Sequence, residues 1–224
     1  MKKKITSFLT VLIVLIVGIW QWLNPSEFLE VAEPKQEQKQ ISEPTNTIDT
    51  TINEKTSQSI DDIDLENPPR FENIRVSSLR SVDGDTFAFY TADGKEHKLR
   101  LLMVDTPESV KKGVSVQPYG KEASDFTKEQ LTKEGVSLVF DKGEVVDNYG
   151  RFLAYVYIGE NSLQELLLEN GLGIVRYVNA GGDSLVEELL TAQEKAQDEK
   201  LGVWSKKDYV MQMKNGYYRY NEVE

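Results

Sequence analysis

The sequence contains no cysteine and a single histidine, His97, among its 224 residues. Disulfides, thiol nucleophiles and cysteine-ligated zinc or iron–sulfur sites are therefore excluded, as are metal sites that need two histidines. Excess basic charge is also lacking, because 26 Lys and Arg stand against 37 Asp and Glu, a formal net charge of −11. The chain therefore cannot bind nucleic acid or anionic lipid through bulk charge. Its chemistry must rest on carboxylates, Arg, Lys, Tyr, hydroxyls or a bound ion.

The first 23 residues have the pattern of an export signal. Three lysines at positions 2–4 precede an apolar stretch over residues 5–23, close to the roughly 20 residues that span a bilayer. No clear A-x-A-like cleavage site follows the stretch, which favours an uncleaved signal anchor. The lysines would then stay in the cytoplasm, and the rest of the chain would lie on the outer face of the cell membrane. A cleaved signal peptide, with secretion, is the alternative.

Residues 24–70 and 71–224 differ in composition. Pro, Glu, Gln, Thr, Asp and Ser dominate the first segment, which predicts a disordered acidic linker. The second segment has 19 Lys and Arg against 26 Asp and Glu, a formal charge of −7, and contains periodic apolar patterns. We therefore predict a globular domain over 71–206. A Tyr-rich C-terminal tail over 207–224 is expected to pack on the surface of that domain.

Short alternating patterns predict five β-strands in the domain. Their ranges are 74–82, 86–90, 96–104, 136–140 and 152–158. Asp83-Gly84 lies between the first two ranges and is typical of a hairpin turn.

Three helical patterns accompany the strands. One covers about 119–131, and capping-box patterns begin the other two, Ser162 with Glu165 and Ser184 with Glu187. Strands and helices in this order indicate an α+β domain. Five strands and three helices fit a closed, five-stranded OB-fold β-barrel, which leaves one face for an extended ligand.

Charged residues gather where the predicted strands end. Arg100 lies among apolar residues of a strand, so it is either buried in a structural ion pair or directed at an anion. The same strand runs directly into Asp105 and Glu108, and Pro107 stiffens the turn between these two carboxylates. Such fixed spacing suits a metal ion or a positioned water molecule.

Arg151 follows a glycine turn at the start of another predicted strand. With Asp85, Asp105, Glu108 and Arg100, it makes a set of three carboxylates and two arginines at the ends of adjacent strands, which could converge on one site. Oxygen ligands alone favour a hard cation such as Ca²⁺. Paired arginines beside such a cation favour a phosphate, because their planar forks bind phosphate oxygens bidentately.

Several runs then resemble, in order and with compatible spacing, the staphylococcal nuclease (thermonuclease) family. The resemblance covers about residues 76–205. The runs that carry it are Val82–Thr86, Arg100–Glu108, Tyr119–Ser124, Phe140–Gly143, Tyr149–Tyr155, Asn170–Leu172, Tyr177-Val178 and Glu194–Ser205.

This resemblance implies an extracellular, Ca²⁺-dependent phosphodiesterase on an OB-fold, an endonuclease that cleaves DNA and RNA and leaves 3′-phosphates. Ca²⁺ would be bound by the carboxylates of Asp85 and Asp105 and by the backbone carbonyl of Thr106. Glu108 takes the position of the family's general base or water-positioning residue. A monomer is the default for this architecture.

Other positions match residues of the family that contact the substrate. Arg100 and Arg151 match its two phosphate-binding arginines, and Arg151 would also assist the leaving oxygen. Lys112 lies in a stretch similar to the family's lysine loop. Tyr149 and Tyr177 match tyrosines that contact nucleotides. DNA and RNA are thus the implied partners, with the membrane as a further one if residues 5–23 are retained.

Two alternatives stay open at this point. The domain could be a noncatalytic OB-fold module that binds nucleic acid or protein at the cell surface, although the retained Asp85, Asp105 and Glu108 argue against it. It could also be an adhesion or structural domain whose acidic surface meets a cationic wall component. Neither alternative predicts Ca²⁺-dependent hydrolysis.

Membrane fractionation tests the N-terminal prediction. If residues 5–23 form an uncleaved anchor, the full chain expressed in a bacterium stays in the membrane pellet after alkaline washing, whereas a variant lacking residues 1–23 is soluble. Recovery of the full chain from the medium with a new N-terminus near residue 24 would instead establish cleavage.

Overall fold

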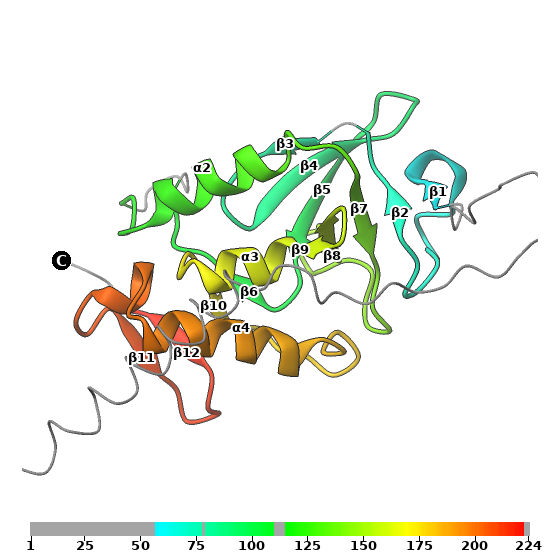
Figure 1. Ribbon diagram of the computed structural model, residues 1–224. Coiled ribbons are helices and arrows are strands. Elements are labelled where there is room, and N and C mark those ends of the chain that lie inside the picture. Colours follow the sequence, from blue (N-terminus) through cyan, green and yellow to red (C-terminus); the bar gives the residue numbers. More distant parts are fainter. Residues whose placement is uncertain (1–56, 78, 110–114, 222–224) are drawn as a thin grey trace, which may run out of the picture. The chain divides into compact units, whose positions relative to one another are not determined.

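The computed structural model describes residues 57–77, 79–109 and 115–221. Three α-helices lie beside one another: α2 (Gly120–Gln130), α3 (Leu163–Glu169) and α4 (Val186–Asp198) (Figure 1). Helices α2 and α3 contact a curved sheet, and α4 packs mainly on α3. Helix α3 packs on the sheet through β8 (Phe152–Ile158) and contacts both other helices. The α+β class and the three helices are thus confirmed for the described residues.

The main sheet has the order β1-β2-β7-β8-β5-β4-β3, and β9 pairs with β8. Its ladders are antiparallel except for β1–β2 and β5–β8, which are parallel. Two small ladders join β6 to β10 and β11 to β12. The remaining strands are β1 (Gln58–Ser59), β2 (Ile74–Arg75), β3 (Leu79–Ser81), β4 (Thr86–Tyr90), β5 (Glu96–Leu101), β6 (Val104–Asp105), β7 (Val136–Val139), β9 (Asn161–Ser162), β10 (Ile174–Val175), β11 (Val210–Gln212) and β12 (Tyr218–Tyr220).

The predicted closed barrel of five strands is wrong for the described part of the chain. The run 74–82 forms two short strands, β2 and β3, which lie at opposite parts of the sheet. Its first residues pair with β7, and its last residues pair with β4. The hydrogen-bonded path is therefore open, and covalent continuity of the chain joins β2 to β3.

Of the two helix N-caps predicted from the sequence, the structure has one. The Ser162 hydroxyl accepts a hydrogen bond from the Glu165 amide at 3.3 Å, which confirms the first capping pattern. The second is wrong, because the Ser184 hydroxyl donates to Asp141 at 2.7 Å and α4 has Leu185 as its N-cap. Asp141 is only 3% exposed, and a buried carboxylate needs such donors.

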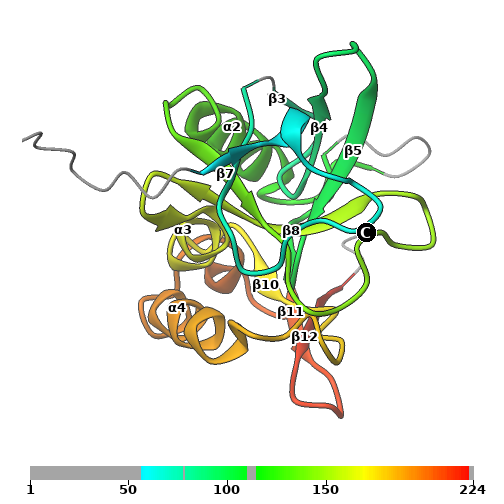
Figure 2. The ribbon, with the colours of Figure 1, turned by 90° about the vertical axis from the view of Figure 1, so that its right-hand side faces the viewer.

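Residues 57–70 belong to the folded unit, in contrast to the linker predicted over 24–70. Strand β1 pairs with β2, and Ile60, in a short 3-10 helix (Ile60–Asp62), is 1% exposed within the main core. Arg70 donates to the Gly143 carbonyl at 2.9 Å. Figure 2 shows this cyan segment beside β7. The segment contains few apolar residues, but Ile60 is part of the main core, and Ile63 and Leu65 pack against it.

The remaining N-terminal predictions, the linker over 24–56 and the signal segment over 1–23, lie outside the described residues. Within the described ranges, no helix combines the length and apolar character needed to cross a bilayer.

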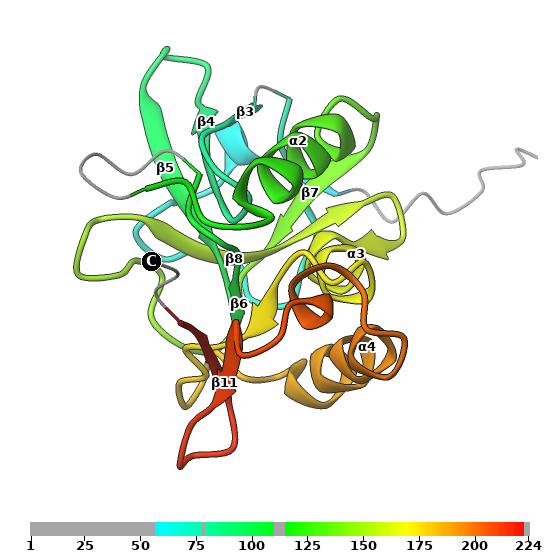
Figure 3. The ribbon, with the colours of Figure 1, turned by 90° about the vertical axis from the view of Figure 1, so that its left-hand side faces the viewer.

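The predicted Tyr-rich tail forms the β11–β12 hairpin. Tyr209 and Tyr220 are buried, and their rings stack at a centroid distance of 5.3 Å. They form a second apolar cluster with Ile174 of β10 and with Val203 of the 3-10 helix Gly202–Ser205. The tail therefore extends the fold beside β6 and β10 (Figure 3).

Unfolding of two alanine variants tests whether residues 57–70 stabilise the domain. Ile60→Ala is expected to lower the free energy of unfolding by about 2–4 kcal/mol, because it leaves a cavity in the core. Ile63→Ala is the matched control and should cost clearly less, since Ile63 is only half-buried. Denaturant titration measures both. Equal, negligible losses would show that the segment adds nothing to stability.

Candidate active site

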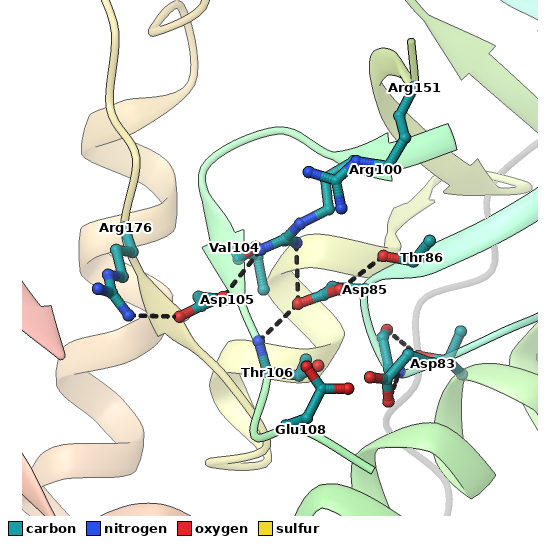
Figure 4. A network of polar contacts seen from close by, with 12 residues as sticks. Asp83, Asp85, Thr86, Arg100, Val104, Asp105, Thr106, Glu108, Arg151 and Arg176 are labelled. Atoms are coloured by element: carbon teal, nitrogen blue, oxygen red, sulfur yellow. Dashed lines mark hydrogen bonds and ion pairs between the residues drawn. The ribbon is translucent and has the colours of Figure 1, made fainter. Parts of the chain in front are cut away.

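The side chain of Arg100 lies between two carboxylates. Its Nη1 atom is 2.8 Å from Asp85 Oδ2, and its Nη2 atom is 2.8 Å from Asp105 Oδ1 (Figure 4). Nη1 also donates to the Val104 carbonyl at 2.6 Å. All three charged side chains are at least 86% buried. The two carboxylates therefore converge on one position that holds a positive charge.

The sheet register produces this convergence. Arg100 pairs with Thr86, so Asp85, one residue earlier, lies beside Arg100 at the end of the β3–β4 turn. Strand β5 then turns sharply through Met103, whose φ is 58°, into β6, which ends at Asp105. The Thr106 amide donates to Asp85 Oδ2 at 2.9 Å and fixes the two turns to each other.

A second arginine, Arg176, contacts the other oxygen of Asp105. Arg176 follows β10, the strand that pairs with β6, and its Nη1 atom is 2.8 Å from Asp105 Oδ2. Burial raises the pKa of the Asp105 carboxyl, and the nearby Asp85 adds to this, whereas Arg100 and Arg176 oppose it. Sequence reasoning missed Arg176. Its only signal was a cation directly after a short apolar strand and before the predicted Tyr177.

The backbone around Glu108 is held from two sides. The Glu108 amide donates to Gln117 Oε1 at 2.8 Å, and the Glu108 carbonyl accepts from the Gln117 amide at 2.9 Å. Beyond it, the Ser109 hydroxyl donates to Asp83 Oδ1 at 2.5 Å. Asp83, predicted only as a turn residue, is thus 8% exposed and ties the β3–β4 turn to the Glu108 segment.

Close backbone packing supports the same region. A Cβ atom at Gly120, the first residue of α2, would lie 2.5 Å from the Glu108 carbonyl oxygen. A Cβ atom at Gly84 would lie 2.6 Å from Thr106 Oγ1. Glycine at both positions lets the helix and the turn approach the segment that carries Thr106 and Glu108.

Arg151 lies at the start of β8, which runs parallel to β5, and its side chain points toward Arg100 (Figure 4). Asp147 Oδ2 accepts from Arg151 Nε at 2.7 Å and lies 2.6 Å from Nη2. Burial alone would raise the pKa of Asp147, but the bonds from the Arg151 amide and side chain outweigh it and lower that pKa. The two predicted arginines thus lie close together, Arg100 in β5 and Arg151 directly before the neighbouring strand β8.

Two tyrosines predicted to contact nucleotides accompany the arginines. The Arg176 guanidinium lies 4.6 Å from the ring centroid of Tyr177, and that of Arg100 lies 5.8 Å from it. Tyr149 is 84% exposed, and the Arg151 guanidinium lies 5.3 Å from its ring centroid. Lys112, the remaining predicted contact, lies outside the described residues.

The oxygen atoms of the site are of the chemical type that binds a hard cation such as Ca²⁺. Asp85 and Asp105 present carboxylate oxygens at one position, where they are 2.8 Å from the same guanidinium, so the site is built to balance positive charge. Backbone carbonyls such as that of Thr106 are ordinary Ca²⁺ ligands. Within the described ranges, no three His, Cys, Asp or Glu side chains group as a metal cluster. A Ca²⁺ ion would therefore depend on Asp85, Asp105, a carbonyl and water.

Comparison with known proteins agrees with this arrangement. A family model described as staphylococcal nuclease homologue matches residues 98–206. The thermonuclease of Staphylococcus hyicus is 46% identical over 127 residues, 57% of this chain and 73% of that protein. The chain belongs to the staphylococcal nuclease family.

Proteins of bacilli are also similar to this chain. Endonuclease YncB of Bacillus subtilis is 42% identical over 137 residues, 61% of this chain and 64% of that protein. A Bacillus anthracis protein named as uncharacterized is 40% identical over 151 residues, 67% of this chain and 70% of that protein. The chain spans about half (47%) of the SPbeta prophage-derived endonuclease YokF.

Carboxyl titration by NMR tests the role of Arg176 at Asp105. Arg176→Gln is expected to raise the pKa of Asp105 further, because it removes a cation that favours the ionised carboxylate. Arg80→Gln is the matched control, since Arg80 pairs with Glu96 on the exposed edge. It should leave the Asp105 titration unchanged. An unaltered or lower Asp105 pKa in Arg176→Gln would contradict the assigned contact.

Proposed function

We propose that this protein is an extracellular, Ca²⁺-dependent nuclease that hydrolyses the phosphodiester bonds of DNA and RNA to give 3′-phosphates. The observation that carries the proposal is that the buried carboxylates of Asp85 and Asp105 meet at one place, where both contact the Arg100 guanidinium. Arg100 and Arg151 on neighbouring strands add the donors that a phosphate needs. The relatives named thermonuclease and endonuclease support the same activity.

Each residue of the site has a separate role in the proposed hydrolysis. Asp85, Asp105 and the Thr106 carbonyl would hold Ca²⁺, which supplies Lewis-acid polarisation of the phosphate when it is bound. Glu108 positions the attacking water and accepts its proton. The water oxygen bonds to phosphorus, the bond from phosphorus to the 5′ oxygen breaks, and the leaving 5′ oxygen takes a proton from solvent water, while Glu108 releases to solvent the proton that it accepted.

The arginines stabilise charge during this displacement. A guanidinium carries five N–H donors, so Arg151 has donors beyond those that Asp147 engages. These donors suit the phosphate and the leaving oxygen, where negative charge grows. Tyr149, which is largely exposed, and Tyr177 offer ring faces to nucleotides, and Lys112 offers a further cation.

The expected setting follows from the N-terminal sequence. Residues 5–23 would anchor the chain in the membrane, or be removed on secretion, and either outcome places the nuclease domain outside the cell. There it would act as a monomer on free DNA and RNA.

Hydrolysis of single-stranded DNA and of RNA tests the function directly. The protein is expected to turn over with Ca²⁺, and to lose activity with chelator. Glu108→Gln should lower kcat by about 10²–10⁴-fold, the usual contribution of a general base. It should still bind DNA in fluorescence anisotropy. Glu160→Gln, at an exposed turn between β8 and β9, is the matched control and should keep full activity.

Two results would overturn the proposal. Absence of hydrolysis by the folded protein with Ca²⁺ or Mg²⁺ would leave a noncatalytic binding module as the better account. Retention of most activity in Glu108→Gln would remove Glu108 from its assigned role.

A further inference from the structure

We propose that the β11–β12 hairpin is a positioning element of the active site, which holds the backbone that carries Thr106 and Glu108. This inference rests on the proposed function. It concerns the hairpin together with Tyr209, the residue directly before β11, and residues 209–220 lie beyond those matched by the family model. The hairpin acts on two stretches of chain, here called the two arms: Asp105–Ser109 and Ser115–Pro118.

One tyrosine hydroxyl reaches each arm. Tyr220 Oη donates to the Asp105 carbonyl at 2.8 Å, at the start of the first arm. Tyr209 Oη donates to the Pro118 carbonyl at 3.0 Å, at the end of the second arm. The arms are in turn joined by the two hydrogen bonds between Glu108 and Gln117. The hairpin therefore fixes both outer ends of a connected unit.

The two tyrosines form one rigid pair. Their rings stack at 5.3 Å with an interplanar angle of 26°, and the Asn221 amide donates to the Tyr209 carbonyl at 2.8 Å. Ile174, which contributes to the same apolar cluster, pairs with Asp105 across the β6–β10 ladder. The hairpin thus rests on the strand that also aligns Asp105.

Packing alone does not require these hydroxyls. A phenylalanine would fill the same apolar cluster, whereas both tyrosines direct their one O–H donor to a carbonyl of the arms. The two buried hydroxyls, each of which donates to a carbonyl of the arms, therefore indicate a role in positioning the arms.

Three conservative variants test the inference: Tyr209→Phe, Tyr220→Phe and their combination. Each removes a hydroxyl and keeps the ring. Tyr218→Phe is the matched control, because Tyr218 lies on β12 but packs edge-on against Trp204 at 5.0 Å. Thermal unfolding first confirms that all four variants are folded at the assay temperature.

Three measurements are then compared with the wild type. Amide hydrogen exchange at Thr106, Glu108 and Gln117 should be about 5–10-fold faster in each single variant, as for one lost buried hydrogen bond. Calorimetric titration with Ca²⁺ should show weaker binding, about three- to tenfold. The kcat value should fall about tenfold with KM within about twofold, since positioning rather than substrate binding is lost.

Equality of the three variants with Tyr218→Phe in exchange and in Ca²⁺ affinity would overturn the inference. Failure of the proposed function looks different. In that case the wild type does not hydrolyse DNA or RNA, while the exchange rates of the arms still decide whether the hairpin holds them.

Discussion

The buried guanidinium of Arg100 sets the conditions that the surrounding structure has to meet. A charged group at this depth is stable only if its donors are matched, and here they meet Asp85, Asp105 and the Val104 carbonyl. The turn before β4 and the turn after β5 must therefore place their carboxylates within hydrogen-bond distance of one side chain. Loss of one partner of such a buried pair typically costs about 3–5 kcal/mol. The proposed chemistry and the stability of the fold thus depend on the same contacts.

Local and overall charge act in opposite directions in this protein. Residues 71–224 carry a formal charge of −7, which repels a polyanion at long range. Within the site, Arg100, Arg151 and Arg176 lie near one another and, in the proposed function, attract phosphate at short range. The Debye length is about 8 Å at physiological ionic strength, so salt screens the repulsion more than it screens the buried pairs. Substrate binding here should therefore tolerate salt better than binding by a basic nuclease does.

The sequence predicts those parts of the site that lie at strand ends. Asp85, Arg100 and Asp105 could be placed because turn and strand patterns fix which residues end a strand. Arg176 and Tyr220 could not, since each reaches Asp105 through tertiary contacts, one from the end of β10 and one from the docked hairpin. Local patterns do not contain that information.

The errors in the predicted fold have the same origin. The run 74–82 looks like one strand, but it bends and serves two parts of the sheet. The polar composition of residues 57–70 predicts a linker, yet Ile60 is buried because it packs into the core formed by distant parts of the chain. The capping pattern at Ser184 was correct locally, yet a distant buried carboxylate, Asp141, takes its hydroxyl. In each case a long-range contact outweighs a local preference.

The parallel pairing of β5 with β8 has a consequence for folding. Arg100 pairs with Leu153, more than 50 positions later in the chain, and Asp105 meets Ile174 at still greater separation. Contacts between such distant residues form only after large loops have closed, at a cost in chain entropy. Asp85, Asp105 and the arginines therefore come together late, so a partly folded chain would offer the proposed Ca²⁺ ion only scattered, solvated carboxylates. Tight Ca²⁺ binding would then report on completed folding and would stabilise the folded chain by mass action.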